Sequence, residues 1–525
     1  MTTPRKESGR VGSTKSRTGC DTCKIRRVRC GEERPFCLRC TSTGRRCFYR
    51  AQHTASVPNL PQLDNYGQSS HPERRAFEYY FHQAGPALSG ILDLGFWSGS
   101  VLQICRLEPA VWDAVIALSA LYERPPVHEA RPFSLLKSPA AVRHSYHHDA
   151  LVWYSRSLAA LRQRIESGTA DVTVSMIGCI LFIAIELLQG NRNAAMTLYQ
   201  QGAQMMTSDM ATGGRTTSSL LLSTIKSLFQ RLGTWVFVIR GVREDSWFPG
   251  LDDMTEQFTS LGEARNVLCS LVAEFKALNT DFKDHWHGGI DDRLRDSPAL
   301  ILRQEHLLKQ LQIWYELFTS LQPIQQSTGE VDGATATLLM TYLSILVETR
   351  ACLNPSQITF DQYEAEFIQI LGYAPAAIAS TCNPDGRQPS FTFEMGIYLP
   401  LFITALKCRA PLLRRQALRF LLQAPAVQGL YMCIPTSRLV AILIALEEDS
   451  TISLDDVASL EDLLGRPGRV PTARERIDGF MVSSQEDEHG EPQPWLNYTL
   501  RDVNIDGSVW ISQRSLRLPA LANTQ

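Results

Sequence analysis

Apolar residues recur at steps of three and four along most of the chain from about residue 73. Such steps place side chains on one face of a helix and make that face apolar. Two runs show the pattern: Val111, Val115, Leu118 and Tyr122, and Leu151, Tyr154, Leu158, Leu161 and Ile165. The spacing predicts a large all-α domain over residues 73–480, in which antiparallel helices bury one shared core.

Prolines and glycines punctuate this pattern. Pro109, Pro139 and Pro435 stand near expected helix starts, and Gly190 stands at an expected joint. The longest apolar stretch, from Met176 to Ile185, is far shorter than the 18 or more residues of a membrane-spanning helix. We expect it to form a buried helix, and we expect no membrane partner.

The flanks of the helical region lack its periodicity. Residues 48–72 are polar and contain prolines at 58, 61 and 72, which is typical of a linker. Residues 1–19 are predicted to be a basic disordered arm, and residues 481–525 a C-terminal tail. Because prolines interrupt the place where a pairing coiled coil could follow residue 47, we expect a monomer or a weak homodimer.

Composition is that of a soluble globular protein, with 44% hydrophobic and 20% charged residues, which excludes wholesale disorder and a collagen-like fibre. The net charge of −2 hides an asymmetry. Residues 1–50 hold 14 Lys and Arg against 4 Asp and Glu, a net +10, so the remainder is net −12. This imbalance indicates a polyanionic partner, such as nucleic acid, near the N-terminus.

Six of the 13 cysteines fall within 28 residues, in the pattern C-x2-C-x6-C-x6-C-x2-C-x6-C. They are Cys20, Cys23, Cys30, Cys37, Cys40 and Cys47. A C-x2-C pair brings two soft sulfur ligands to one tetrahedral metal. Two such sites need eight ligands, and no histidine lies between the first and last cysteine, so two thiolates must be shared between two metals.

The segment GCDTCKIRRVRCGEERPFCLRCTSTGRRC resembles the fungal zinc binuclear cluster DNA-binding domain. The resemblance covers residues 20–47 and implies two zinc ions per chain. It also implies that Cys20 and Cys37 bridge the two ions, that Cys23 and Cys30 complete one site, and that Cys40 and Cys47 complete the other. Pro35 matches the proline of the loop that joins the two halves.

A cluster of six cysteines can also serve purposes other than DNA binding. A disulfide framework would need an exported protein, and MTTPRKESGRVGS has no apolar stretch of the kind found in a secretory signal. An iron–sulfur site fits worse because the usual ferredoxin spacings are absent. A zinc module used only for protein contacts is the strongest competitor.

The segment between the second and third cysteines is strongly basic. If it forms one or two helical turns, Ile25 and Val28 face the cluster and the cations face outward. The resemblance implies that Arg26 and Arg27 contact the bases of a CGG-like triplet in the major groove. Predicted phosphate contacts are Lys24, Arg29, Arg39, Arg45 and Arg46. A nuclear-import signal is an alternative use of the same cations.

The large domain carries no recognisable catalytic motif. RAFEYYFHQAGPALSGILDLGFW and LFITALKCRAPLLRRQALRFL resemble parts of a fungal-specific transcription factor regulatory domain, which implies an all-α body without catalysis. His144, His147 and His148 could place two imidazoles one turn apart, but no acidic or cysteine partner is spaced to complete a metal site, so ordinary histidines are expected.

Two acidic stretches are mixed with apolar residues. The first is Glu447-Glu448-Asp449 running on to LDDVASLEDLLG, and the second is Glu486-Asp487-Glu488 before Pro494-Trp495-Leu496. That composition is found in activation segments that fold on a coactivator, whereas an ordinary amphipathic helix is the alternative for the first stretch.

Together these features predict a nuclear, sequence-specific regulator of RNA polymerase II transcription, with secondary metabolism as one field of action. Its predicted partners are double-stranded DNA and coactivators or corepressors, and it is not predicted to be an enzyme. The alternative is a protein-interaction scaffold with a structural zinc module and only nonspecific nucleic-acid binding.

Overall fold

A computed structural model gives the protein as two compact units, Met1–Gly67 and Gln68–Gln525. The structure describes residues 20–26, 28–32, 37–43, 69–90, 92–125, 145–211, 219–240, 257–287, 297–321, 331–383, 385–394, 396–449, 464–465, 468–486, 492–506 and 508–518.

The first unit contains two short helices, α1 (Asp21–Ile25) and α2 (Leu38–Thr41). A cysteine in extended conformation precedes each helix, Cys20 before α1 and Cys37 before α2. Among the described residues of this unit, the buried ones are cysteines rather than aliphatic side chains. So little apolar surface cannot stabilise a fold of this size without cross-links.

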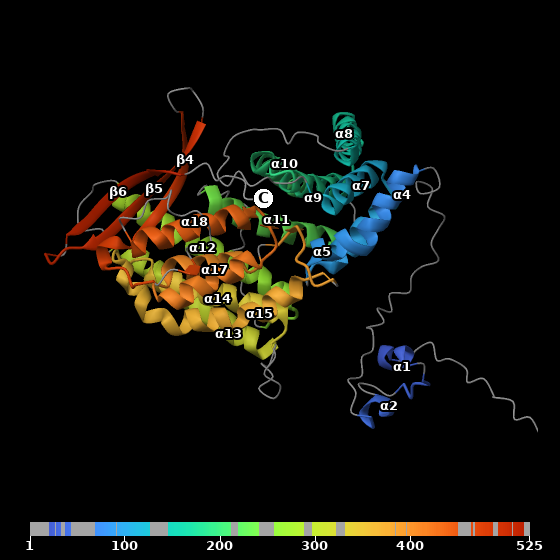
Figure 1. The fold of residues 1–525 in the computed structure, drawn as a ribbon. Helices are drawn as coiled ribbons and strands as arrows, with labels where there is room; N and C mark the ends of the chain where they lie inside the picture. The colour runs from blue at the N-terminus through green and yellow to red at the C-terminus, as the bar shows by residue number, and fades with distance from the viewer. Residues whose placement is uncertain are drawn as a thin grey trace, which may run out of the picture. The chain divides into compact units, whose positions relative to one another are not determined.

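The second unit begins with helices that surround α7 (Pro109–Glu123), whose residues are buried on almost all sides. Pro109 occupies the first turn of α7, as predicted. The elements that pack on α7 are α4 (His71–Tyr79), the π-helical turn Tyr80–Ala84, α6 (Val101–Leu107), α8 (Ser145–Glu166) and α9 (Val172–Leu188). The same part of the chain also contains α5 (Gly85–Ser89), the π-helical turn Phe96–Ser100, and α10 (Arg192–Ala211), which packs on α9. Figure 1 shows α4, α7, α8 and α9 together at one end of this unit.

The stretch Met176 to Ile185 lies within α9, and most of that helix is buried. The helix ends before Gly190, whose φ of 77° gives the left-handed turn that glycine adopts without strain. Among the helices of the described ranges, not one is both long and apolar enough to cross a membrane. The prediction of a buried helix here is confirmed.

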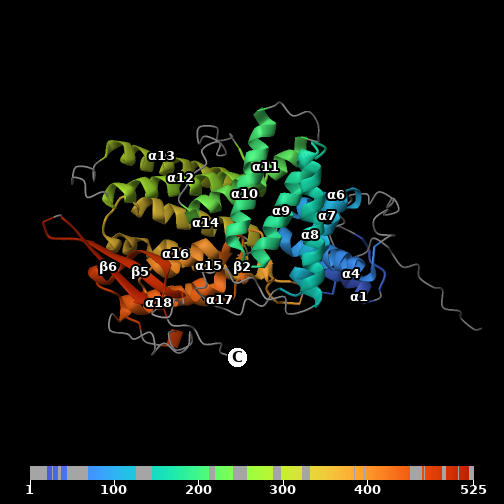
Figure 2. The same ribbon diagram turned by 90° about the horizontal axis from the view of Figure 1, so that it is seen from above.

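The larger core lies in the second half of this unit. Its helices are α11 (Ser219–Arg240), α12 (Leu261–His287), α13 (Pro298–Leu321), α14 (Gly333–Ala351), α15 (Glu364–Thr381), α16 (Tyr398–Lys407), α17 (Pro411–Leu422) and α18 (Cys433–Glu448), with a 3-10 helix at Gln357–Tyr363. Figure 2 shows α12, α13 and α14 running side by side. The fold class predicted from the sequence, a small zinc cluster domain followed by a largely helical body, is confirmed.

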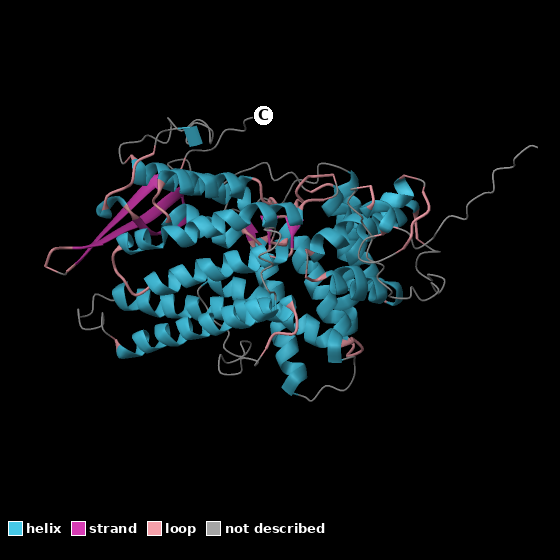
Figure 3. Ribbon diagram, turned by 90° about the horizontal axis from the view of Figure 1, so that it is seen from below, coloured by secondary structure: helices cyan, strands magenta, loops and turns pink. Residues whose placement is uncertain are grey.

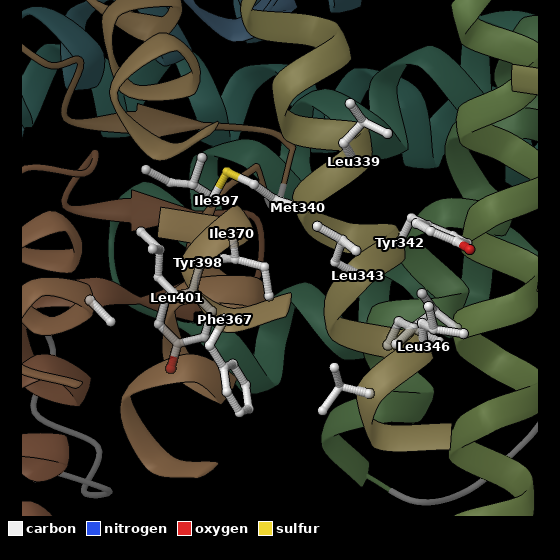
Figure 4. Packing of buried hydrophobic residues seen from close by; sticks show 14 of the residues in the cluster. Leu339, Met340, Tyr342, Leu343, Leu346, Phe367, Ile370, Ile397, Tyr398 and Leu401 are labelled. Atoms are coloured by element: carbon white, nitrogen blue, oxygen red, sulfur yellow. The ribbon is translucent and has the colours of Figure 1, made fainter. Parts of the chain in front are cut away.

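Close packing around α14 holds these helices together. Figure 4 shows leucines of α14 facing Phe367 and Ile370 of α15 and Leu401 of α16. On its other side, Tyr342 of α14 stacks on the fully buried Trp314 of α13, with ring centroids 5.4 Å apart. Because α14 is apolar all round, it can be enclosed by neighbours on every side.

Two small sheets complete the body. The first joins β1 (Phe391–Thr392), β2 (Val427–Gln428) and β3 (Tyr431–Met432). The second is antiparallel and joins β4 (Ile477–Glu486), β5 (Pro492–Val503) and β6 (Val509–Arg517) in that order. Figure 3 shows the longer strands at one end of the helical body.

The second sheet replaces the C-terminal tail expected over 481–525, so that expectation is wrong for residues up to Arg517. Register pairs Val482 with Leu496 and Leu496 with Leu516, which aligns apolar side chains on one face. That face packs on Leu443 and its neighbours in α18. The alternation in each strand is too short and too mixed with polar residues to indicate a sheet from the sequence.

Candidate metal centre and nucleic-acid interface

The two short helices aim cysteines at a common centre. Residues three apart lie on the same side of a helical turn, which brings Cys20 beside Cys23 and Cys37 beside Cys40. The backbone N–H of Cys23 donates to Cys20 Sγ at 3.3 Å, so Cys20 also caps α1. All four side chains are 0% exposed.

Sulfur–sulfur distances test whether this set fits zinc. Cys20 Sγ lies 3.8 Å from Cys37 Sγ and 3.7 Å from Cys40 Sγ, and Cys23 Sγ lies 3.7 and 3.8 Å from the same two atoms. Two thiolates bound to one tetrahedral zinc at about 2.3 Å are about 3.8 Å apart. A disulfide would bring the sulfurs to about 2.05 Å. The separations of 3.7–3.8 Å therefore fit zinc ligands and not a disulfide framework.

Cys30 joins the set from the loop after α1. Its sulfur lies within 4.8 Å of those of Cys20, Cys23 and Cys37. It accepts hydrogen bonds from the backbone N–H of Cys20 at 3.3 Å and of Glu32 at 3.4 Å. Glu32 adopts φ 65°, which is rare for a residue with a side chain. These N–H groups can stabilise negative charge on a metal-bound sulfur.

The crowded sulfurs perturb one another. Burial and the neighbouring thiols raise the pKa of Cys23 well above its usual value. Burial also pushes the pKa of Cys37 upward, but hydrogen bonds from Cys40 and from the Cys23 and Cys30 thiols outweigh it and lower that pKa to about 6. A divalent metal must displace the remaining protons, so binding depends on pH.

The predicted DNA contacts divide into described and undescribed residues. Lys24, Arg29 and Arg39 are exposed, and Arg26 is half-buried at the C-terminal end of α1. Cys47, Arg27, Arg45, Arg46 and Pro35 lie outside the described residues.

Helix α1 includes only the first two residues of the basic segment, Lys24 and Ile25. It ends at Ile25, and Val28 is 37% exposed in the following loop, where its N–H donates to the carbonyl of Cys23. The expectation that Val28 faces the cluster is therefore wrong, because helical spacing does not extend beyond Arg26.

Arg26 makes a contact that the sequence did not suggest. Its Nη1 donates to Thr43 Oγ1 at 3.3 Å, across the two halves of the unit. Thr43 lies just after α2 and is one of the six residues between Cys40 and Cys47 that the cysteine spacing leaves unspecified, so spacing alone does not single it out.

Buried cysteines and exposed basic residues are also the features by which the sequence resembles the fungal zinc binuclear cluster domain. Residues 18–56 match the fungal Zn(2)-Cys(6) binuclear cluster domain. The zinc cluster domain covers the whole cysteine pattern, including Cys47. Zinc ions held by these sulfurs would cross-link the two halves of the unit, and the sulfur distances given above fit that use.

Related proteins carry the same kind of name. The chain is 28% identical over 274 residues to the aspercryptin biosynthesis cluster-specific transcription regulator atnN of Emericella nidulans, which covers 43% of this chain and 40% of that protein. It is 31% identical over 133 residues to the Zn(2)-C6 fungal-type transcription factor afumD of Aspergillus fumigatus, 22% of this chain and 35% of that protein.

A third relative matches a shorter part of the chain at higher identity. The chain is 42% identical over 60 residues to the transcriptional regulatory protein moc3 of Schizosaccharomyces pombe, 11% of this chain and 10% of that protein. In each case the match spans less than half the length of the relative. No solved structure matches the chain.

Among all described residues, the cysteine set of the zinc cluster domain is the group placed to hold a metal ion. The described residues of the helical body contain no second group of this kind. His147 Nε2 bonds the carbonyl of Arg124 at 2.8 Å, and exposed His148 lies 3.7 Å from Asp149. His144 lies outside the described residues. The relatives are transcription regulators rather than enzymes.

The structure describes only the start of the first acidic stretch, because residues 450–463 lie outside the described residues. Glu447 and Glu448 belong to α18 and are buried, and they form ion pairs with Arg409, Arg414 and Arg415. The carboxylates are therefore used to join α18 to the start of α17. Sequence reasoning missed these arginines because an RR pair on a helix usually lies in solvent.

A second buried charge cluster lies in the body. Asp93 accepts from Arg231 at 2.7 Å and from both terminal nitrogens of Arg265 at 2.8 and 3.0 Å, and Glu394 pairs with the same arginines. A cavity of about 60 Å³ lies beside it, lined mainly by leucines, Trp235 and Phe393. The four charges balance, so this cluster is a structural joint between distant segments.

Proposed function

We propose that this protein is a sequence-specific DNA-binding regulator of RNA polymerase II transcription that acts in the nucleus and reads CGG-like triplets in the major groove. The observation that carries the proposal is the set of buried cysteines with sulfurs 3.7–3.8 Å apart, which holds a basic segment in a fixed position. The names of the related proteins support the regulatory role.

Two zinc ions would be held by six thiolates. Cys20 and Cys37 are the proposed bridging ligands, with Cys23 and Cys30 on one ion and Cys40 and Cys47 on the other. The sulfurs of Cys20, Cys23, Cys30 and Cys37 lie within 4.8 Å of one another, which supports the first of these sites. The ions supply rigidity and carry out no reaction.

Arg26 and Arg27 are the proposed base contacts. An arginine can donate two parallel hydrogen bonds to guanine O6 and N7, which distinguishes guanine from the other bases. Lys24, Arg29, Arg39, Arg45 and Arg46 are the proposed phosphate contacts, and the exposure of Lys24, Arg29 and Arg39 suits that role. Such contacts fix the position of a domain on DNA without specifying sequence.

The helical body is proposed to regulate the DNA-binding unit and to contact coactivators or corepressors. The relative named for aspercryptin biosynthesis supports a target among the genes of a biosynthetic cluster. We propose a monomer or a weak homodimer.

Selection from a random pool of DNA duplexes tests the function. The full chain, loaded with zinc, should enrich duplexes with a CGG-like triplet, and the pattern of enrichment reports the number of half-sites. Arg26→Ala should relax one base position, since a bidentate pair supplies about 1–3 kcal/mol of discrimination.

Arg39→Ala is the matched control, because loss of an exposed phosphate contact should weaken binding to cognate and scrambled duplexes equally. Enrichment of no sequence above the salt-sensitive background would overturn the proposal and favour a scaffold with nonspecific nucleic-acid binding.

A further inference from the structure

Arg26 and Thr43 belong to different halves of the zinc cluster domain, and their side chains meet. The guanidinium Nη1 of Arg26 donates to Thr43 Oγ1 at 3.3 Å, across 17 residues of sequence. Arg26 is the C-cap residue that follows α1, and Thr43 lies just beyond the C-terminal end of α2. The bond therefore joins the basic segment of one half to the helix of the other.

Thr43 is itself held in place. Its hydroxyl donates to the carbonyls of Arg39 at 2.9 Å and Cys40 at 3.2 Å, and its backbone N–H donates to the carbonyl of Cys40 at 3.2 Å. A hydroxyl has one proton and two lone pairs. Because the proton faces α2, a lone pair faces the guanidinium, and the side chain acts as a fixed acceptor.

The contact leaves Arg26 able to bind a base. A guanidinium has five N–H donors, and in the part of the chain that the structure describes Thr43 is the side chain that takes one of them. The others can form the two-pronged contact with guanine. A side chain ordered before binding loses less conformational freedom when the complex forms.

We propose that Thr43 is a positioning residue for Arg26 in sequence recognition. It orders the guanidinium before DNA arrives, so discrimination at one base position depends on a hydroxyl that itself contacts no base. This inference rests on the proposed function, because it requires Arg26 to be a base contact.

Thr43→Val tests it, because valine keeps the shape of the side chain and removes the acceptor. The full zinc-loaded chain is titrated with the selected duplex and with duplexes changed at each base of the triplet. Discrimination at one position should fall by about two- to tenfold, the range expected for one lost hydrogen bond. Thr43→Ser should restore it.

Thr41→Val is the matched control. The Thr41 hydroxyl also donates to carbonyls near α2, those of Cys37 at 3.3 Å and Leu38 at 3.1 Å, and it has no arginine partner in the described structure. Its loss should leave discrimination unchanged. Zinc content is measured for every variant, and two ions per chain show that the cluster is intact.

A double-mutant cycle separates positioning from general loosening. In an Arg26→Ala background, Thr43→Val should have no further effect on discrimination. An equal effect of Thr43→Val with and without Arg26 would overturn the inference, and so would equal behaviour of the Thr43 and Thr41 variants.

The same titrations show which idea fails. If the unmodified chain prefers no sequence, the proposed function fails. If Arg26→Ala relaxes one position and Thr43→Val does not, the positioning role alone fails.

Discussion

Arg414 of α17 donates to Glu447 of α18 at 2.6 Å, and both side chains are almost fully buried. Glu447 also accepts from Arg409 at 2.9 Å and from the backbone N–H of Ile477, the first residue of β4, at 2.7 Å. One carboxylate thus joins two helices and the first strand of the C-terminal sheet.

Glu447→Leu should strongly destabilise the body. The substitution leaves two buried guanidinium groups without their shared partner, and breaking a buried ion pair costs about 3–5 kcal/mol. Urea unfolding followed by circular dichroism measures the loss. Glu166→Ala is the control, because it removes an exposed pair with Arg162 and should leave the urea midpoint almost unchanged. Equal midpoints for the two variants would contradict a structural role for Glu447.

Gly468→Ala should destabilise the same region through a steric clash. A Cβ at this position would lie 2.4 Å from Arg415 Nη1, 2.6 Å from Pro411 Cβ and 2.8 Å from Glu448 Oε2. Overpacking of this kind costs about 1–3 kcal/mol. Gly465→Ala offers a matched comparison, since nothing lies within 4 Å of its added Cβ. Thermal melts of the two variants should differ, and identical melting temperatures would refute the packing described for residue 468.

Because of Lys407, the body should become more stable as pH rises from about 7 toward the pKa that this lysine has in the unfolded chain. Burial, helped by the nearby Arg409, lowers the pKa of Lys407 to about 7, although Asp478 and Glu348 oppose the shift. The unfolded chain therefore binds more protons than the folded chain between that pKa and about 10.4, and stability increases with pH over this window. Urea midpoints measured from pH 7 to 9.5 should rise less steeply for Lys407→Met. An unchanged slope would show that Lys407 is charged in the fold.

Removal of zinc should unfold the zinc cluster domain and spare the body. The described core of the first unit consists of cysteines, whereas the body has its own apolar core. A strong chelator should abolish DNA binding while the helical circular dichroism signal of the body persists. Full DNA binding after the metal has been removed and its loss confirmed by elemental analysis would count against the zinc centre.

The sequence predicted what depends on local spacing. The cysteine intervals located the metal centre, and steps of three and four located helices such as α7 and α8, because both signals repeat within a few residues. Features that depend on the folded chain escaped prediction. The cysteine spacing leaves Thr43 unspecified, and the partners of Glu447 lie 30 or more residues away in the chain.

The C-terminal strands escaped for a different reason. Residues such as Leu496 and Leu500 alternate with polar neighbours over only a few positions, and a sheet is defined by pairing between strands rather than within one. A run such as Glu447-Glu448-Asp449 looks solvent-exposed in a sequence, since only the fold can supply buried arginines as partners.

Helix α18 serves two interiors at once. Val440, Ala441 and Ile444 belong to the main core. Leu439, Ile442 and Leu443 pack against the sheet formed by β4, β5 and β6. A chain shortened to end before Ile477 would expose the second group to water and invite aggregation. An expression fragment of the body should therefore extend at least to Leu518, the last buried residue of that smaller interior.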